Sequence, residues 1–345
     1  MISSFLNKYT KKVKNLDPHP LWTPLRIGQQ TVKSRLILPP MASGTGDERG
    51  HVTDATLAHY ARVVNGRQGL VFVEYTSVHP WGRSELRQVG LHHDEHQAGL
   101  ARLAALIRKH GALPGIQLTH AGGKTDAELI GRKALGASDV AIPAYGGDLP
   151  APEPMSAEDI ASLFHAFVEA ALRAEAAGFA AIEIHCAHGY FFNQWLSPLT
   201  NQRQDRHGGS PEARSKLLLD LIAALRNHLR PQTILSLRFP GQDRLPGGLT
   251  LDDTIPLAQA VARAGADVLN VSSGLGGWRR GREQRGEGYL VEDGAILRRS
   301  IGIPVIGVGG VASLEYCREV LNRGDVDMLA VGRAILENPA WPLPA

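Results

Sequence analysis

Residues 156–186, SAEDIASLFHAFVEAALRAEAAGFAAIEIHC, contain one complete unit of the pattern that decides the fold. Ser156 with Asp159 three residues later resembles a capping box, which is typical of a helix N-terminus, and Gly178 is typical of the residue after a helix. The apolar run at 181–186 is short and rich in isoleucine, as a strand buried on both faces should be. The stretch therefore predicts a helix followed directly by a buried strand.

The same alternation runs along the whole chain. Further helices are expected at 53–64, 94–110, 210–229, 251–264, 292–300 and 313–322. Strands are expected at 36–41, 70–74, 115–120, 181–186, 234–239, 268–273, 304–310 and 328–333. An open doubly wound sheet is the alternative, but eight evenly spaced units favour closure. We therefore predict an α/β fold of the (β/α)8 type, a TIM barrel.

The chain of 345 residues is long enough for one such barrel and shows no linker or shift in composition that marks a second domain. We expect an N-terminal extension at 1–24 and a single barrel domain at 25–345. Two long irregular stretches, 122–154 and 274–289, follow strands three and six. Because barrel active sites form at the C-terminal ends of the strands, these loop excursions are candidate lids.

Composition excludes several classes of partner. The formal net charge is +3 and no basic stripe is interleaved with aromatic residues, so a nucleic-acid partner is not expected. No run of about 18 apolar residues occurs, so no membrane span is expected. The N-terminus lacks a signal-peptide pattern, and two cysteines are too few for a disulfide framework. These features predict a cytoplasmic protein.

The ends of strands seven and eight carry a candidate phosphate site. Gly309 and Gly310 follow strand seven, and Gly332 with Arg333 ends strand eight. Glycines let backbone N–H groups approach a phosphate, and an arginine adds a forked cationic donor. Tight turns alone would also explain the glycines, but phosphate binding after strands seven and eight is recurrent in barrels. The combination favours a phosphate.

Gln117 and Arg238 lie at the ends of two other strands. An amide donates and accepts together, which suits the edge of a pyrimidine ring, and a guanidinium can stabilise an anionic reduced ring. Each residue taken singly is equally well explained as a hydrogen-bonded barrel side chain. Their joint placement favours a flat heterocyclic cofactor.

Strand four ends in HCAHGY, residues 185–190, which admits three interpretations. A metal site needs a third and usually a fourth ligand, and no carboxylate with ligand spacing follows a nearby strand. Local hydrogen bonding of the two histidines is the second interpretation. The third, which we favour, is that His185 and His188 bind an oxyanion while Tyr190 delivers a proton.

Several motifs together resemble the old yellow enzyme family, most closely its bacterial, thermophilic-like branch, from about residue 25 to 342. The motifs are Pro40-Met41, QLTHAG at 117–122, HCAHGY at 185–190, LSPLTNQRQDRHGGS at 196–210, VSSG at 271–274 and VGR at 331–333. The resemblance implies an FMN-binding barrel at 25–345 and an ene-reductase. NADPH or NADH would supply hydride, which would pass through flavin N5 to an α,β-unsaturated carbonyl or nitro compound.

The resemblance also implies roles for individual residues. His185 and His188 would hold the substrate oxygen, and Tyr190 would protonate the α-carbon. Other branches of the family often have asparagine at the second position of the pair. No metal is implied. The implied FMN contacts are Pro40, Met41, Ala42, Tyr75, Gln117, His185, Arg238, Gly309, Gly310, Gly332 and Arg333.

Four positions depart from the family pattern. Ala42 stands where Cys or Thr is usual, Gly44 where a Tyr is common, Tyr75 where Ala is usual, and Gly123 where Arg is common. The first and third bear on the flavin potential and on the shape of the pocket. They leave open another flavin-dependent dehydrogenase, isomerase or dienoyl-thioester reductase, or a flavin-binding protein with low turnover. A metal-dependent hydrolase or lyase is a further alternative. A small enone-type substrate and a possible homo-oligomer are expected.

Overall fold

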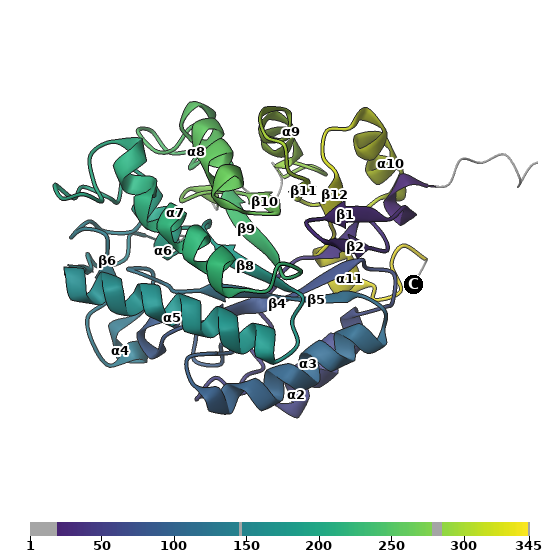
Figure 1. Ribbon diagram of the computed structural model, residues 1–345, viewed down its shortest axis with the longest axis horizontal. Coiled ribbons are helices and arrows are strands. Elements are labelled where there is room, and N and C mark those ends of the chain that lie inside the picture. The colour runs from purple at the N-terminus through teal and green to yellow at the C-terminus, as the bar shows by residue number, and fades with distance from the viewer. Residues whose placement is uncertain (1–18, 145–146, 278–284, 344–345) are drawn as a thin grey trace, which may run out of the picture.

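Eight short apolar segments form a closed barrel of parallel strands in the computed structural model, which describes residues 19–144, 147–277 and 285–343. The predicted TIM barrel is therefore confirmed (Figure 1). In order around the barrel, the strands are β3 (Leu36–Leu38), β4 (Leu70–Ser77), β5 (Leu113–Thr119), β8 (Ala181–His185), β9 (Ile234–Pro240), β10 (Val268–Ser272), β11 (Val305–Gly307) and β12 (Met328–Ala330). Strand β12 pairs with β3 and closes the ring.

Helices surround the strands, as Figure 1 shows. They begin and end where local signals place them: Ser156 and Asp159 form a capping box, and Gly265 ends its helix with a φ of 112°. All seven expected helices form. The helices that follow the strands are α2 (Asp54–Val63), α3 (Gln97–Lys109), α5 (Ala157–Ala176), α7 (Pro211–His228), α8 (Leu251–Ala264), α9 (Val291–Ser300), α10 (Leu314–Arg323) and α11 (Arg333–Glu337).

A hairpin that the sequence analysis did not predict covers the N-terminal end of the barrel. Its strands are β1 (Leu25–Ile27) and β2 (Gln30–Val32), joined by a turn at Gly28 with a φ of 54°. Ile27 and Val32 are fully buried against inward-facing side chains of the barrel. Each of these strands has a single buried residue, so no apolar run marks them in the sequence.

The two strands beside the predicted phosphate site are shorter than expected. The predictions of 304–310 and 328–333 are wrong at their C-terminal ends, because β11 ends at Gly307 and β12 at Ala330. Gly309 and Gly310 have φ angles of 116° and 72°, a left-handed region that extended strands do not use. Arg333 is the first residue of α11.

The long excursions carry short elements of their own. In 122–154 these are α4 (Ala127–Ile130) and two short strands, β6 (Leu135–Gly136) and β7 (Glu153–Pro154), which pair in parallel. Helix α6 (Phe191–Leu196) follows the histidine motif.

Residues 1–18 of the expected extension and 278–284 of the second excursion lie outside the described residues. The 3₁₀ turns are η1 (Pro20–Trp22), η2 (Pro80–Gly82) and η3 (Asp94–His96).

The segment 20–24, assigned to the extension, packs on the barrel. Leu21 in η1 is fully buried, and its carbonyl accepts a hydrogen bond of 2.8 Å from the backbone N–H of Arg35, just before β3.

Among the described residues, no helix combines the length and the apolar character that crossing a bilayer requires.

Candidate functional site

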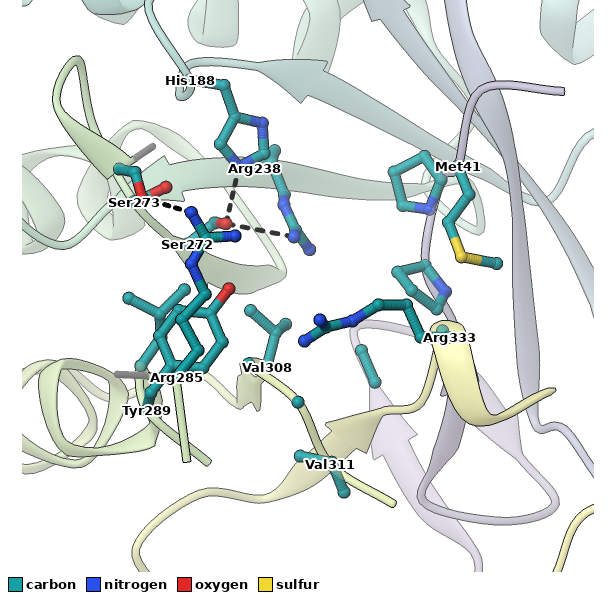
Figure 2. Close-up of a pocket in the computed structure, with 18 of the residues that line it drawn as sticks. Met41, His188, Arg238, Ser272, Ser273, Arg285, Tyr289, Val308, Val311 and Arg333 are labelled. Atoms are coloured by element: carbon teal, nitrogen blue, oxygen red, sulfur yellow. Dashed lines mark hydrogen bonds between the residues drawn. The ribbon is translucent and has the colours of Figure 1, made fainter. Parts of the chain in front are cut away.

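A cavity of about 720 Å³ opens at the C-terminal ends of the barrel strands (Figure 2). The structure brings residues from several strand ends together around it. Those among the predicted site residues that line it are Pro40, Met41, His188, Arg238, Gly309, Gly310, Gly332 and Arg333. Five others do not line it, namely Ala42, Tyr75, Gln117, His185 and Tyr190. His185 and Tyr190 contact the lining residues His188 and Lys124, Gln117 contacts Glu183, and Tyr75 stacks on Tyr190.

The glycine corner of the cavity has the properties of an anion site. Gly309 and Gly310 hold left-handed conformations, and a Cβ built on Gly309 would lie 2.9 Å from the backbone nitrogen of Leu290. Arg333 extends from α11 into the cavity in Figure 2 and makes no hydrogen bond or ion pair with any described residue. An exposed, uncompensated guanidinium beside a glycine turn fits the phosphate of FMN.

A buried carboxylate organises the floor beneath the cavity. Glu183 on β8 is fully buried, and it accepts hydrogen bonds from Gln117 Nε2 (2.8 Å), Ser236 Oγ (2.9 Å) and Asn270 Nδ2 (2.9 Å). Burial raises the pKa of Glu183, while Arg238 and these three donors act in the opposite direction. One carboxylate thereby fixes side chains from three neighbouring strands.

The orientation of Arg238 follows from the same network. Its NH1 donates to Asn270 Oδ1 at 2.5 Å, and its NH2 donates to Ser272 Oγ at 3.1 Å. Its Nε is buried and has no hydrogen-bond partner among the described residues. Buried donors normally find an acceptor, so this unpaired N–H fits the edge of a flavin ring.

The two histidines of the HCAHGY motif face one another. His185 ends β8, and His188 follows in a left-handed conformation with a φ of 60°. His188 Nδ1 lies 3.2 Å from His185 Nε2, and the rings are nearly perpendicular. Burial lowers the pKa of both imidazoles well below the ordinary value, with Arg238 and Lys124 adding to the effect. Both rings are therefore neutral at neutral pH.

Metal-ligating side chains do not gather around this pair within the described ranges. Across the described residues, one group of three potential metal ligands occurs, at His51, Glu95 and His96. Both ring nitrogens of His96 already face carbonyl oxygens, at 3.0 Å and 3.1 Å. Nothing in this part of the chain supports the metal-dependent hydrolase or lyase.

Tyr190 packs directly on the histidine pair. Its ring meets that of His185 edge-on, with centroids 4.9 Å apart, and stacks on Tyr75 at 5.8 Å. Lys124 Nζ lies 4.9 Å from the ring centroid, and the hydroxyl is 3.4 Å from Ser84 Oγ. Burial raises the pKa of Tyr190, so the phenol keeps its proton at neutral pH.

Neither Tyr75 nor Ala42 lines the cavity. Tyr75 stacks on Tyr190, and Ala42 is exposed just beyond the cavity residue Met41. Both remain predicted flavin contacts. Gly44, also exposed, has open space around its Cβ direction.

Three polar residues of the site were not predicted from the sequence. Lys124 and Ser272 line the cavity, and Asn270 connects Glu183 to Arg238. Ser272 is the last residue of β10, so the rule that strand ends carry function could have identified it. Lys124 lies in a loop, where no period predicts the direction of a side chain.

The buried residue His120 directly follows β5, and the pH dependence of stability tests the effect of burial on its pKa. Burial, together with His79, lowers its pKa to about 3, so the unfolded chain takes up a proton below pH ~6.5 while the folded chain does not. His120 therefore destabilises the fold as the pH falls.

The His120→Asn variant should lack this loss. Its unfolding free energy minus that of the wild type should rise by about 1.4 kcal/mol for each pH unit that the pH is lowered from 6 to 4. Urea unfolding at several pH values measures it, with His165→Asn as the exposed control. A constant difference would contradict the prediction.

Comparisons with known proteins agree with this geometry. A family model described as the NADH:flavin oxidoreductase / NADH oxidase family matches residues 20–345. The NADPH dehydrogenase of Geobacillus thermodenitrificans (strain NG80-2) is 38% identical over 328 residues, which cover 94% of this chain and 93% of that relative.

Solved structures share the fold. A 2-naphthoyl-CoA reductase in complex with 2-naphthoyl-CoA matches with a TM-score of 0.85 at 22% identity, over 93% of this chain and 51% of that one, so this chain spans about half of its length. The old yellow enzyme homologue of Zymomonas mobilis matches with a TM-score of 0.80 at 23% identity, over 93% of this chain and 91% of that one.

Proposed function

Because the chain belongs to the NADH:flavin oxidoreductase / NADH oxidase family, and is therefore an NAD(P)H-dependent FMN oxidoreductase of the old yellow enzyme type, we propose that it reduces activated alkenes. The substrates would be α,β-unsaturated carbonyl or nitro compounds. Bound FMN would accept a hydride from NADPH or NADH and pass it to the β-carbon of the alkene. Side chains of this protein would bind the substrate oxygen and protonate the α-carbon.

One observation carries the proposal: two neutral imidazoles meet at 3.2 Å at the C-terminal end of β8, with a protonated phenol packed against them. In this proposal His185 and His188 donate hydrogen bonds to the substrate oxygen, whose negative charge grows as the alkene is reduced. Neutral imidazoles suit this role because they stabilise the charge by hydrogen bonding and do not protonate the oxygen. Tyr190 then delivers a proton to the α-carbon.

Gln117, Arg238 and Arg333 would hold the cofactor. Gln117 and Arg238 are oriented by Glu183 and Asn270, and they would contact the ring of FMN. Arg333, with the left-handed Gly309 and Gly310, would bind the phosphate.

The test of this function is a flavin titration. The purified protein should be yellow with bound FMN, NADPH or NADH should bleach it, and cyclohexenone or maleimide should restore the colour. Restoration by dioxygen but by no alkene of a panel of enones, nitroalkenes and maleimides would overturn the ene-reductase assignment and favour a flavoprotein with low turnover. Conversion of an alkene without any added reductant would favour an isomerase.

Arg333→Ala should weaken FMN binding by about 10- to 100-fold, because it removes a charge-assisted hydrogen bond to the phosphate. Binding of riboflavin, which lacks the phosphate, should change little. Fluorescence quenching of the two ligands on cofactor-free protein measures both constants. Equal losses for FMN and riboflavin would place Arg333 away from the phosphate.

A further inference from the structure

One cationic side chain of the cavity wall has no negative partner. Lys124, in the turn that follows β5, is partly buried and lines the cavity. Its Nζ donates to the carbonyl of His188 at 2.7 Å and lies 4.9 Å from the ring centroid of Tyr190, but no carboxylate in the described part of the chain forms an ion pair with it. Burial lowers the pKa of Lys124. Buried charges are normally paired, and this ammonium has N–H donors left for an anion.

The turn that carries Lys124 is fixed to the turn that carries the histidine motif. Gln194 on α6 is fully buried and accepts a hydrogen bond from the backbone N–H of Gly123 at 2.9 Å. Its Nε2 donates to the carbonyls of Ala121, at 2.9 Å, and Gly189, at 2.7 Å. A Cβ built on Gly189 would lie 3.8 Å from Lys124 Nζ, so the ammonium packs over the second turn. Because one buried amide links both turns, the fold itself sets the position of the charge.

The order of the strands places Lys124 across the barrel from the predicted phosphate site. In the ring of eight, β5 is opposite β11 and β8 is opposite β12. Lys124 follows β5, whereas Gly310 follows β11 and Arg333 follows β12, so a phosphate bound there lies on the wrong side to be its counter-ion. Glu337, the one carboxylate among the described residues of the cavity wall, is on α11 with Arg333. The wall beside Tyr190 is therefore positive, with no acid of its own among those residues.

We propose that Lys124 binds a carboxylate of the substrate, so that the cavity favours activated alkenes that carry a negative charge away from the C=C bond. Hydrogen bonds between an ammonium and a carboxylate are charge-assisted and stronger than those between neutral groups. A neutral enone would leave the ammonium unpaired. The carboxylate takes no part in the reaction, so its contact strengthens substrate binding and appears in KM. Reduction of such an alkene rests on the proposed function, whereas affinity for the carboxylate does not.

A pair of substrates that differ only in charge tests this preference. In 6-oxohept-4-enoate and its methyl ester, methylene groups separate the enone from the carboxyl group, so both enones have the same reactivity. In Lys124→Met, which keeps the length of the side chain, kcat/KM for the acid relative to the ester should fall about 10- to 100-fold, through KM. Lys124→Arg keeps the charge and should retain most of the preference. Lys133→Met is the matched control, because Lys133 is exposed in the same excursion and does not line the cavity.

Equilibrium binding provides a readout that needs no turnover. On the oxidised, FMN-loaded protein, 3-(4-hydroxyphenyl)propanoate and its methyl ester present the same phenol and differ in charge. The change in flavin absorbance during a titration gives both dissociation constants. Relative to the ester, the acid should bind about 10- to 100-fold more weakly to Lys124→Met than to the wild type, and Lys133→Met should match the wild type.

Two other roles of Lys124 give different results. Lys124→Met also removes the hydrogen bond to the carbonyl of His188, and that loss acts on acid and ester alike. Equal losses for both members of each pair would make Lys124 a support of the His188 turn and overturn the proposal. The diphosphate of NADPH is another source of negative charge. A loss confined to the affinity for NADPH in the reductive half-reaction would assign the ammonium to the dinucleotide and would also overturn the proposal.

The carboxylate site and the ene-reductase assignment fail separately. If the wild type reduces no alkene but prefers the phenolic acid in a manner that depends on Lys124, the ene-reductase assignment falls and the carboxylate site stands. If the wild type reduces both members of the enone pair and Lys124→Met leaves the acid-to-ester ratios of both experiments unchanged, only the carboxylate site falls.

Discussion

Tyr190→Phe is expected to slow the reoxidation of the reduced enzyme by an activated alkene by about 10²- to 10⁴-fold, the range for loss of a general acid. The raised pKa of the buried phenol keeps it protonated at neutral pH, so it can supply a proton when the α-carbon becomes carbanion-like. Reduction by NAD(P)H involves no proton from this residue and should stay within about twofold of the wild type. Stopped-flow absorbance of the flavin follows the two half-reactions separately.

Tyr75 supplies the matched comparison, since it is a second phenol stacked on the first at 5.8 Å. Tyr75→Phe removes the same atom from the neighbouring ring, which is not assigned as the proton donor, and should leave most of the alkene half-reaction intact. An equal loss in both variants would mean that the two phenols act as a unit. A loss confined to reduction by NAD(P)H in Tyr190→Phe would show that Tyr190 is not the proton donor.

Glu183→Leu is expected to lower the free energy of unfolding by about 3–5 kcal/mol, the range for removing one partner of a buried ionic network. The substitution leaves the donors of Gln117, Ser236 and Asn270 without an acceptor inside the barrel. It also removes the negative charge nearest to Arg238. Urea unfolding of the cofactor-free protein at neutral pH measures the loss.

Two further variants sharpen this result. Glu319→Leu is the matched surface control, since Glu319 is exposed on α10 and contacts only Arg323, at 3.8 Å, among the described residues; it should lose less than about 1 kcal/mol. Glu183→Gln keeps the shape of the side chain but turns an amide toward three donors, so it should fall between the two. Wild-type stability in Glu183→Leu would be incompatible with a network held by the carboxylate.

The parts of the fold that the sequence predicted are those that local chemistry determines. Ser156 caps its helix with atoms three residues away, and the short, isoleucine-rich run before His185 is typical of a strand buried on both faces. The hairpin at 25–32 was missed because each of its strands has a single buried residue, so no apolar run marks them, and because its burial depends on the barrel above it. The strand ends at 307 and 330 were misplaced because a valine follows each of them and continues the apolar run up to the next glycine.

The site likewise contains residues that the sequence could identify and contacts that only the folded structure shows. Strand-end position and residue type were enough to select Arg238, Arg333 and the two histidines as candidates. They could not tell that Glu183 would orient Gln117, or that Ser272 would lie between Arg238 and His188. Those relations join residues on different strands, and they depend on the register of the barrel instead of on spacing along the chain.

The left-handed conformation of His188 restricts how this position can evolve. With a φ of 60°, residue 188 suits glycine, asparagine and aspartate better than other amino acids, and β-branched side chains worst. Of these three, only asparagine keeps an N–H donor for an oxyanion without adding a negative charge. Histidine and asparagine codons differ in their first base alone, so one nucleotide change exchanges two residues that fit both this backbone conformation and the proposed oxyanion contact.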